Sequence, residues 1–224
     1  SKSQLEIHLF DSVSAKLLYR SSIPHGGNPV HAVVVENNLV ITYWNTVMKR
    51  TELSSVALFE GMIDKAGLTP WAAKSSKAIA QKHIDSVSFN SFTAPLPMAI
   101  QKTFVLPKSV SAAGATITRQ GVAKKAILVG TTGGQVFSID RQMINPRRPI
   151  DDPTAAEKAD GLFKYEPFLA LDTLQSPTHN YSMAFGPFSI ISAATDLESS
   201  SVTLSISRLD VHFNRVIPSL AFDL

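Results

Sequence analysis

The chain has 224 residues, 44% of them hydrophobic, so it can bury a sizeable core as one all-β domain or two small domains. Its net charge is only +3, and Lys and Arg are scattered rather than gathered in a basic stripe, which argues against nucleic-acid binding. The absence of cysteine excludes disulfides, thiolate metal sites and a cysteine nucleophile, and no apolar run approaches the roughly 18 residues of a membrane span.

The first part of the chain predicts short strands separated by turns, at residues 5–10, 16–20, 30–35, 39–44 and 53–59. Residues 23–29, which contain two adjacent glycines, are predicted as a loop. In the hairpin turn at residues 36–38 we expect an asparagine to take the left-handed region. The regular short spacing indicates an all-β fold rather than βαβ units.

Residues 62–97 interrupt this pattern and predict a long, variable loop. Residues 72–82 contain helix formers without a clear apolar stripe, so we expect at most a short helix there. Within it, we expect residues 70–95 to be the least ordered part of the chain. Strands are predicted again at residues 99–106 and 110–118.

Residues 126–140 give the strongest local signal. A short apolar run is followed by a turn with Gly133 and Gly134, and then by an alternating segment. This pattern predicts a β-hairpin in which Val136 lies on one face and Phe137 and Ile139 on the other. Gly134 is expected at positive φ, which a tight turn requires.

Beyond this hairpin we expect one helical turn at residues 141–145, a short helix at 154–160, and strands at 168–171, 183–194, 202–206 and 211–217. The strand count predicts one domain over residues 1–224, a partial β-propeller of about four to five blades with a long irregular insertion. The alternative is a β-sandwich. A partial propeller leaves strand edges and apolar faces open, so the isolated fragment is expected as an open arc or a homodimer.

No pattern in the chain predicts a catalytic, cofactor or metal site. The histidines lack the i, i+4 helical spacing of a metal site, and no nucleophile elbow occurs. Asn180 begins the single N-glycosylation sequon. Arg147 and Arg148 lie between two prolines, where they are expected to act at an interface or to pin the loop by hydrogen bonds to carbonyl groups.

Several stretches resemble the C-terminal lumenal region of subunit 1 of the endoplasmic reticulum (ER) membrane protein complex. They include Tyr43-Trp44-Asn45-Thr46, Lys49-Arg50-Thr51-Glu52-Leu53-Ser54, residues 115–130, Asn145-Pro146-Arg147-Arg148-Pro149 and Arg215-Val216-Ile217-Pro218-Ser219. The resemblance covers nearly the whole chain except the loop. Because the chain lacks an initiating Met, residues 1–3 are expected to lie within a longer protein.

The resemblance implies a lumenal scaffold without catalytic residues or cofactors, anchored in the full-length protein by a helix that follows this region. Its partners would be the other subunits and, in addition, client membrane proteins, because the complex inserts and folds tail-anchored and multipass membrane proteins. The structural or interface candidates are Trp44, Asn45, Arg50, Glu52, Gly133, Gly134, Arg147 and Arg148. Two alternatives stay open: a quinoprotein-like propeller enzyme and a freestanding peptide-binding propeller.

Overall fold

The structure, a computed structural model, describes residues 4–59, 91–92, 94, 96–171 and 176–218. Within these residues the chain forms twelve strands and one short helix. They are β1 (Gln4–Phe10), β2 (Leu17–Pro24), β3 (Gly26–Val35), β4 (Asn38–Asn45), β5 (Arg50–Phe59), β6 (Met98–Leu106), β7 (Val110–Ala115), β8 (Ala126–Thr131), β9 (Val136–Asp140), α2 (Ala155–Ala159), β10 (Ser189–Ala194), β11 (Ser201–Ile206) and β12 (Val211–Val216). The predicted all-β class is confirmed. Most of the loop expected at residues 62–97 lies outside the described residues.

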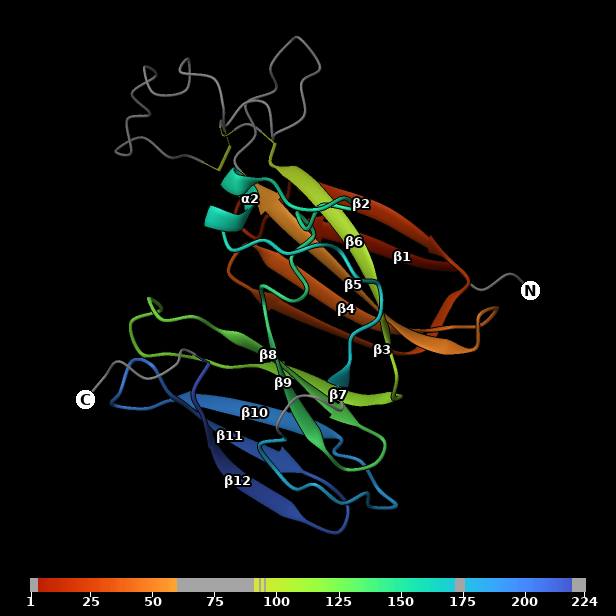
Figure 1. The fold of residues 1–224 in the computed structure, drawn as a ribbon, viewed down its shortest axis with the longest axis vertical. Helices are drawn as coiled ribbons and strands as arrows, with labels where there is room; N and C mark the ends of the chain where they lie inside the picture. Colours follow the sequence, from red (N-terminus) through yellow and green to blue (C-terminus); the bar gives the residue numbers. More distant parts are fainter. Residues whose placement is uncertain (1–3, 60–90, 93, 95, 172–175, 219–224) are drawn as a thin grey trace.

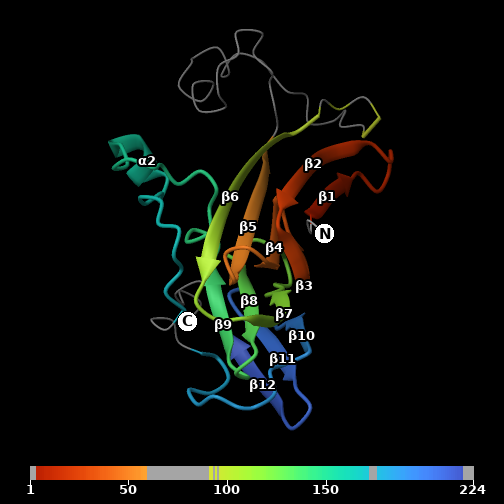
Figure 2. The same cartoon turned by 90° about the vertical axis from the view of Figure 1, so that its right-hand side faces the viewer.

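The strands form four antiparallel sheets: β1-β2, β3-β4-β5-β6, β7-β8-β9 and β10-β11-β12, called here the first to fourth sheets. In each one, neighbours in sequence are neighbours in the sheet, which is the up-and-down order of a propeller blade. Greek-key crossovers, which a sandwich uses, do not occur in the described sheets. The sheets follow one another in chain order along the long axis (Figures 1 and 2). This arrangement agrees with a partial propeller and not with the alternative sandwich.

Each junction between successive sheets has its own apolar core. Since side chains along a strand alternate between its two faces, β4 sends Ile41 toward the first sheet and Val40 toward the third. The first junction contains Ile7, Ile23, Leu39, Ile41, Tyr43 and Val56; the second includes Val40, Leu53, Phe104, Val110, Ile127, Val129, Phe137 and Ile139; the third contains Leu128, Val136 and Val216, with Ile190 packed against them. The first two junctions are therefore held by face-to-face burial of apolar side chains, whereas at the third the central strand of the fourth sheet buries the hydroxyl side chains of Ser201, Thr203 and Ser205.

The hairpin predicted at residues 126–140 is confirmed as β8 and β9. All six residues of β8 are buried, because both of its faces are covered by neighbouring sheets. Phe137 and Ile139 pack toward the second sheet, whereas Val136 packs toward the fourth, as the alternation predicted. Gly134 has φ of +90°, so its expected positive φ is also confirmed.

Two expectations in the first part of the chain were wrong. The loop expected at residues 23–29 is strand, because β2 extends to Pro24 and β3 begins at Gly26. A Cβ on Gly26 would lie 2.8 Å from the Cβ of Leu5, so this glycine permits close packing of strands rather than a loop. In the turn before β4 the left-handed residue is Glu36, with φ of 54°, rather than an asparagine.

Several later elements are shorter than predicted. Residues 141–145 form turns, with Asp140 O accepting from Met143 N at 3.0 Å, rather than a helical turn. Phe168 makes only an isolated parallel bridge to Val105, because the apolar character of residues 168–171 reflects packing into the core and not a strand. The strand expected at 183–194 begins at Ser189. The short helix expected at 154–160 is confirmed, with Thr154 and Glu157 forming a capping box.

Glu198, in the turn between β10 and β11, holds the loop that follows β7. Its carboxylate accepts hydrogen bonds from the backbone amides of Gln120 at 2.6 Å, Val122 at 2.8 Å and Ala123 at 3.1 Å. These bonds, that from Gln120 above all, lower the pKa of Glu198 to about 2. The carboxylate thereby joins the third and fourth sheets through a loop.

We expect acid to release this loop. Because the folded pKa of about 2 lies below the ordinary 4.5, the carboxylate stabilises the fold above pH 4.5, and this contribution is lost as the pH falls toward 2. Hydrogen exchange of the amides of residues 120–123, corrected for its intrinsic pH dependence, should quicken across that window. Glu198→Gln should remove the change; an unaltered pH profile in this variant would contradict the assignment.

Candidate functional site

The residues that the sequence singled out lie in buried polar networks, in a glycine turn and at the surface. The described residues hold no group of three or more His, Asp or Glu side chains placed to bind a metal ion. Among the described helices, none is long and apolar enough to cross a membrane.

Glu52 is the centre of the first network. Its side chain is buried, and its carboxylate accepts hydrogen bonds from Tyr43 Oη at 2.9 Å, Asn45 Nδ2 at 3.1 Å and Arg50 Nε at 2.8 Å. Burial and the adjacent Glu52 carboxylate raise the pKa of Tyr43, so its hydroxyl stays protonated and donates. This network fixes the ends of β4 and β5 to each other.

Asn45 also shapes the turn between β4 and β5. Its Oδ1 accepts from the backbone amides of Val47 at 3.1 Å and Met48 at 2.9 Å, and the apolar side chains of these two residues are exposed at the tip. Trp44 lies opposite Thr51 and is partly buried. The interface role predicted for Trp44 stays a prediction.

Arg148 is a buried cation without a carboxylate in hydrogen-bonding contact within the described part of the chain. Its guanidinium donates to the carbonyls of Met143 at 2.5 Å, Phe163 at 3.4 Å and Lys164. Its Cζ lies 5.0 Å from the ring centre of Phe163 and 5.8 Å from that of Phe104. The carbonyl bonds expected from the sequence are present, and burial lowers the pKa of this guanidinium. Arg148 thus pins the segment after β9 against β6.

Arg147 points to a different place. Its Nη2 pairs with Asp160 Oδ2 at 2.8 Å, just beyond α2, and its guanidinium lies over Phe59 at 5.9 Å. The two adjacent arginines therefore hold different segments. Neither contact tests the interface role that the sequence predicts for Arg147.

Gly133 and Gly134 bring the β8–β9 turn close to the segment before β10. A Cβ on Gly133 would lie 2.8 Å from Ser182 Oγ, and one on Gly134 would lie 3.1 Å from Met183 Cβ. The backbone of Met183 donates to Gly133 O at 2.7 Å. Glycine is needed here both for the positive φ at Gly134 and for the close approach.

We expect Gly134→Val to destabilise this turn by about 1–3 kcal/mol, because a β-branched residue at positive φ is strained. Hydrogen exchange of residues 131–136 in the full-length protein would measure the loss. Gly134→Asn is the matched control, since asparagine tolerates the left-handed region; equal effects of valine and asparagine would show that strain is not the cause.

Asn180 lies exposed in the segment before β10. Its neighbours His179 and Tyr181 stack with ring centres 4.1 Å apart, and His179 Nδ1 lies 2.6 Å from Tyr181 O. The sequon is thus held on an ordered, accessible turn. Attachment of a glycan there stays a prediction.

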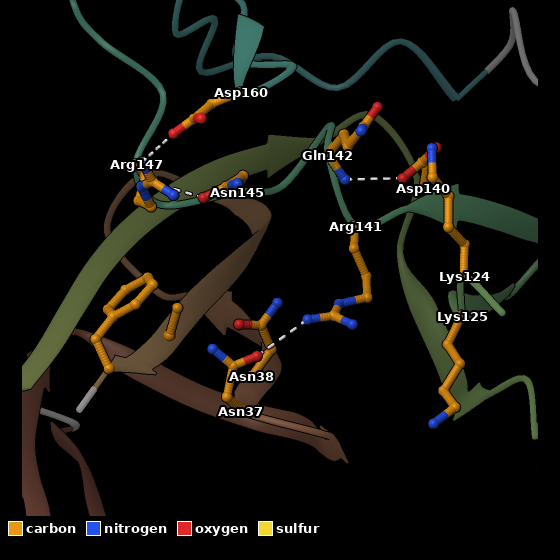
Figure 3. Close-up of a pocket in the computed structure, with 12 residues that line it drawn as sticks. Asn37, Asn38, Lys124, Lys125, Asp140, Arg141, Gln142, Asn145, Arg147 and Asp160 are labelled. Carbon is orange, nitrogen blue, oxygen red and sulfur yellow. Dashed lines mark hydrogen bonds and ion pairs between the residues drawn. The ribbon is translucent and has the colours of Figure 1, made fainter. Parts of the chain in front are cut away.

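A pocket of about 270 Å³ lies where the second and third sheets meet near α2 (Figure 3). Four cationic and two anionic side chains line it. Its lining is Asn37, Asn38, Ala57, Phe59, Lys124, Lys125, Asp140, Arg141, Gln142, Asn145, Arg147 and Asp160. Of this set, Arg147 alone was a structural or interface candidate from the sequence, because the others converge from turns that are far apart in the chain.

Glu36 organises the cations on one side of the pocket. It pairs with Lys125 Nζ at 3.0 Å and with Arg141, whose Nη2 also donates to Asn37 Oδ1 at 3.1 Å. Partial burial alone would raise the pKa of Glu36, but the bonds from Lys125 and Arg141 outweigh it and lower this pKa. Glu36 is therefore charged and neutralises only part of this positive cluster.

The outer faces of the first and fourth sheets differ in polarity. On the fourth sheet, Ile191, Leu204 and Phe213 lie opposite one another across three strands, flanked by Val202, Ile206 and Val211. Phe213 is 70% exposed. The outer face of the first sheet carries charged and polar groups beside the exposed Phe10, with Glu6 near both His8 and Arg20. We call the six-residue apolar surface of the fourth sheet the end face.

The fold and these surfaces define one class of protein, a β-propeller domain whose last sheet has an uncovered apolar face. Residues 1–219 match the family model for ER membrane protein complex subunit 1, second beta-propeller. The chain therefore belongs to this family, and the resemblance seen in the sequence is confirmed.

Curated relatives agree with this assignment. The chain is similar to proteins named ER membrane protein complex subunit 1 from Gallus gallus, with 28% identity over 97% of the chain, and from Schizosaccharomyces pombe, with 28% identity over 100% of it. The Saccharomyces cerevisiae protein of the same name is 25% identical over 98% of the chain. The chain spans only 20%, 24% and 28% of the lengths of these three relatives, respectively.

Proposed function

We propose that this chain is a non-enzymatic scaffold and interaction domain in the ER lumen, within a subunit of the ER membrane protein complex. The full-length protein would be held at the membrane by a helix outside this region and would bind the other subunits and client membrane proteins. The complex would insert and fold tail-anchored and multipass membrane proteins. Membership of the subunit 1 family supports the complex, and the polar networks support a structural role.

The end face is the observation that carries the scaffold proposal. Six apolar side chains on one face of a sheet resemble the faces that are buried at the first two junctions, where each large side chain contributes about 1.5–3 kcal/mol. We infer that a further sheet of the same polypeptide covers this face. The relatives are about four to five times longer than the chain, which leaves ample polypeptide for that sheet.

A second copy of the chain stacked head to tail is a poorer occupant. In a head-to-tail pair, the end face would meet the outer face of the first sheet, where Glu6, His8 and Arg20 would lose water against apolar side chains. We therefore propose the homodimer expected from the sequence only for the isolated fragment, in which no other sheet is available.

Affinity capture of the full-length protein from detergent extract tests the proposed function. Co-purification of the other subunits in fixed proportion is expected. Capture of the protein alone, with tight binding of a soluble peptide, would favour a freestanding propeller. A visible cofactor spectrum after adding pyrroloquinoline quinone and Ca²⁺ would favour the quinoprotein alternative instead.

A further inference from the structure

We propose that the pocket between the second and third sheets binds a carboxylate side chain from a partner polypeptide. The inference rests on the proposed role as a complex subunit, which supplies the partner. Its direct basis is an excess of cations and two unused hydrogen-bond groups at one place (Figure 3).

Asn38 provides the first unused group. It is 6% exposed, it lines the pocket, and its side-chain amide makes no hydrogen bond to the part of the chain that the structure describes. Asn38 and Arg141 both line this pocket (Figure 3). This amide opens onto the pocket, where it can donate a hydrogen bond to an acceptor that a ligand supplies.

Arg141 provides the second unused hydrogen-bond group. Its two terminal nitrogens bind Glu36 and Asn37, but its Nε is buried and has no partner among the described residues. An N–H of a guanidinium prefers an anionic oxygen, because charge-assisted bonds are about twice as strong as neutral ones. The ligand oxygen is therefore expected to be negative.

Lys124 adds positive charge at the rim. It is exposed, and no carboxylate lies in contact with it among the described residues. The lining contains four cations and two carboxylates, of which Asp160 is paired with Arg147. Glu36, beside the pocket, pairs with Lys125 and Arg141, so among the described residues the charge of Lys124 is the one that would attract an incoming anion. About 270 Å³ accommodates one acidic side chain and a short length of backbone.

Carbodiimide coupling of the purified complex tests the proposal, because this reagent joins an amine to a carboxylate only where the two touch. Mass spectrometry is expected to find an isopeptide bond between Lys124 and an Asp or Glu of another subunit. Lys49 is the matched comparison, since it is also exposed but lies at the opposite end of β4 and β5. Any bond that Lys49 forms to a partner should not depend on Asn38.

Asn38→Leu keeps the size of the side chain but removes the amide, and it should lower the coupling yield at Lys124 about tenfold. Asn37→Leu, which removes an amide already engaged with Arg141 and Leu58, should have a smaller effect on coupling. Normal co-purification of the subunits would show that each variant still assembles.

Three results would overturn the proposal. One is an intact complex in which Lys124 reacts with a small amine reagent but never couples to a partner. Another is coupling that Asn38→Leu leaves unchanged. The third is protection of Lys124 by inorganic phosphate in the isolated full-length protein together with no partner coupling, which would assign the pocket to a small anion. Because all of them are read on an assembled or purified protein, they are distinct from failure of the subunits to co-purify.

Discussion

Replacing Glu52 with leucine is expected to destabilise the second sheet by about 3 kcal/mol, because removing one partner of a buried polar network leaves the others unpaired. Tyr43, which is 1% exposed, would lose the acceptor for its hydroxyl, and Asn45 and Arg50 would lose theirs. Hydrogen exchange of the β4 and β5 amides in the full-length protein would then quicken by about a hundredfold.

The double variant Glu52→Leu with Tyr43→Phe is the control. Removing both the donor and the acceptor should recover part of the loss, about 1–2 kcal/mol, since residues in one network are not additive. If the double variant is as unstable as the sum of the two single variants, the hydroxyl–carboxylate bond is not what holds these strands together.

Arg148→Met is expected to cost a similar amount, about 3 kcal/mol, because methionine keeps the apolar stem but leaves three backbone carbonyls without their donor. The loss should appear as faster hydrogen exchange in residues 143–148 and 163–165. Arg148→Lys should recover only part of it, because a single ammonium cannot reach three carbonyls that a planar guanidinium spans.

Arg119→Met provides the comparison for Arg148. Arg119 is mostly exposed and pairs with a fully exposed Asp196, so its replacement should change stability by less than about 1 kcal/mol. Equal effects at positions 119 and 148 would contradict the assignment of Arg148 as a buried pin.

The sequence predicted the fold best where local chemistry decides structure. The β8–β9 hairpin could be read from Gly134 and from the alternation of Val136, Phe137 and Ile139, since a tight turn and a half-covered strand leave a direct pattern. The capping box at Thr154 was equally local. The loop expected at residues 23–29 was wrong because the role of Gly26 is set by Leu5, a tertiary neighbour.

The site was harder to predict than the fold. The carbonyl bonds of Arg148 were anticipated from its place between two prolines, but their acceptors are up to sixteen residues away. The pocket depends on Glu36, Lys125 and Arg141. Glu36 is 89 residues from Lys125 and 105 from Arg141, and it meets them only when the second and third sheets pack. Neither the composition of the chain nor the spacing of these residues predicts that they lie together in the fold. The sequence predicted an uncovered apolar face, but the residues of the end face can be identified only from the register of β10, β11 and β12.

Accessibility of the end face in the full-length protein tests the central claim most directly. Because this chain has no cysteine, Phe213→Cys places one thiol on the end face, and Val122→Cys places one on a loop where the native side chain is 81% exposed. Ile191→Cys, on the same face, guards against a folding defect peculiar to position 213. If another sheet of the same polypeptide covers the face, maleimide should label positions 213 and 191 at least about tenfold more slowly than position 122. Labelling of all three at the same rate in folded full-length protein would contradict the claim that this chain is an arc completed by the rest of its own polypeptide.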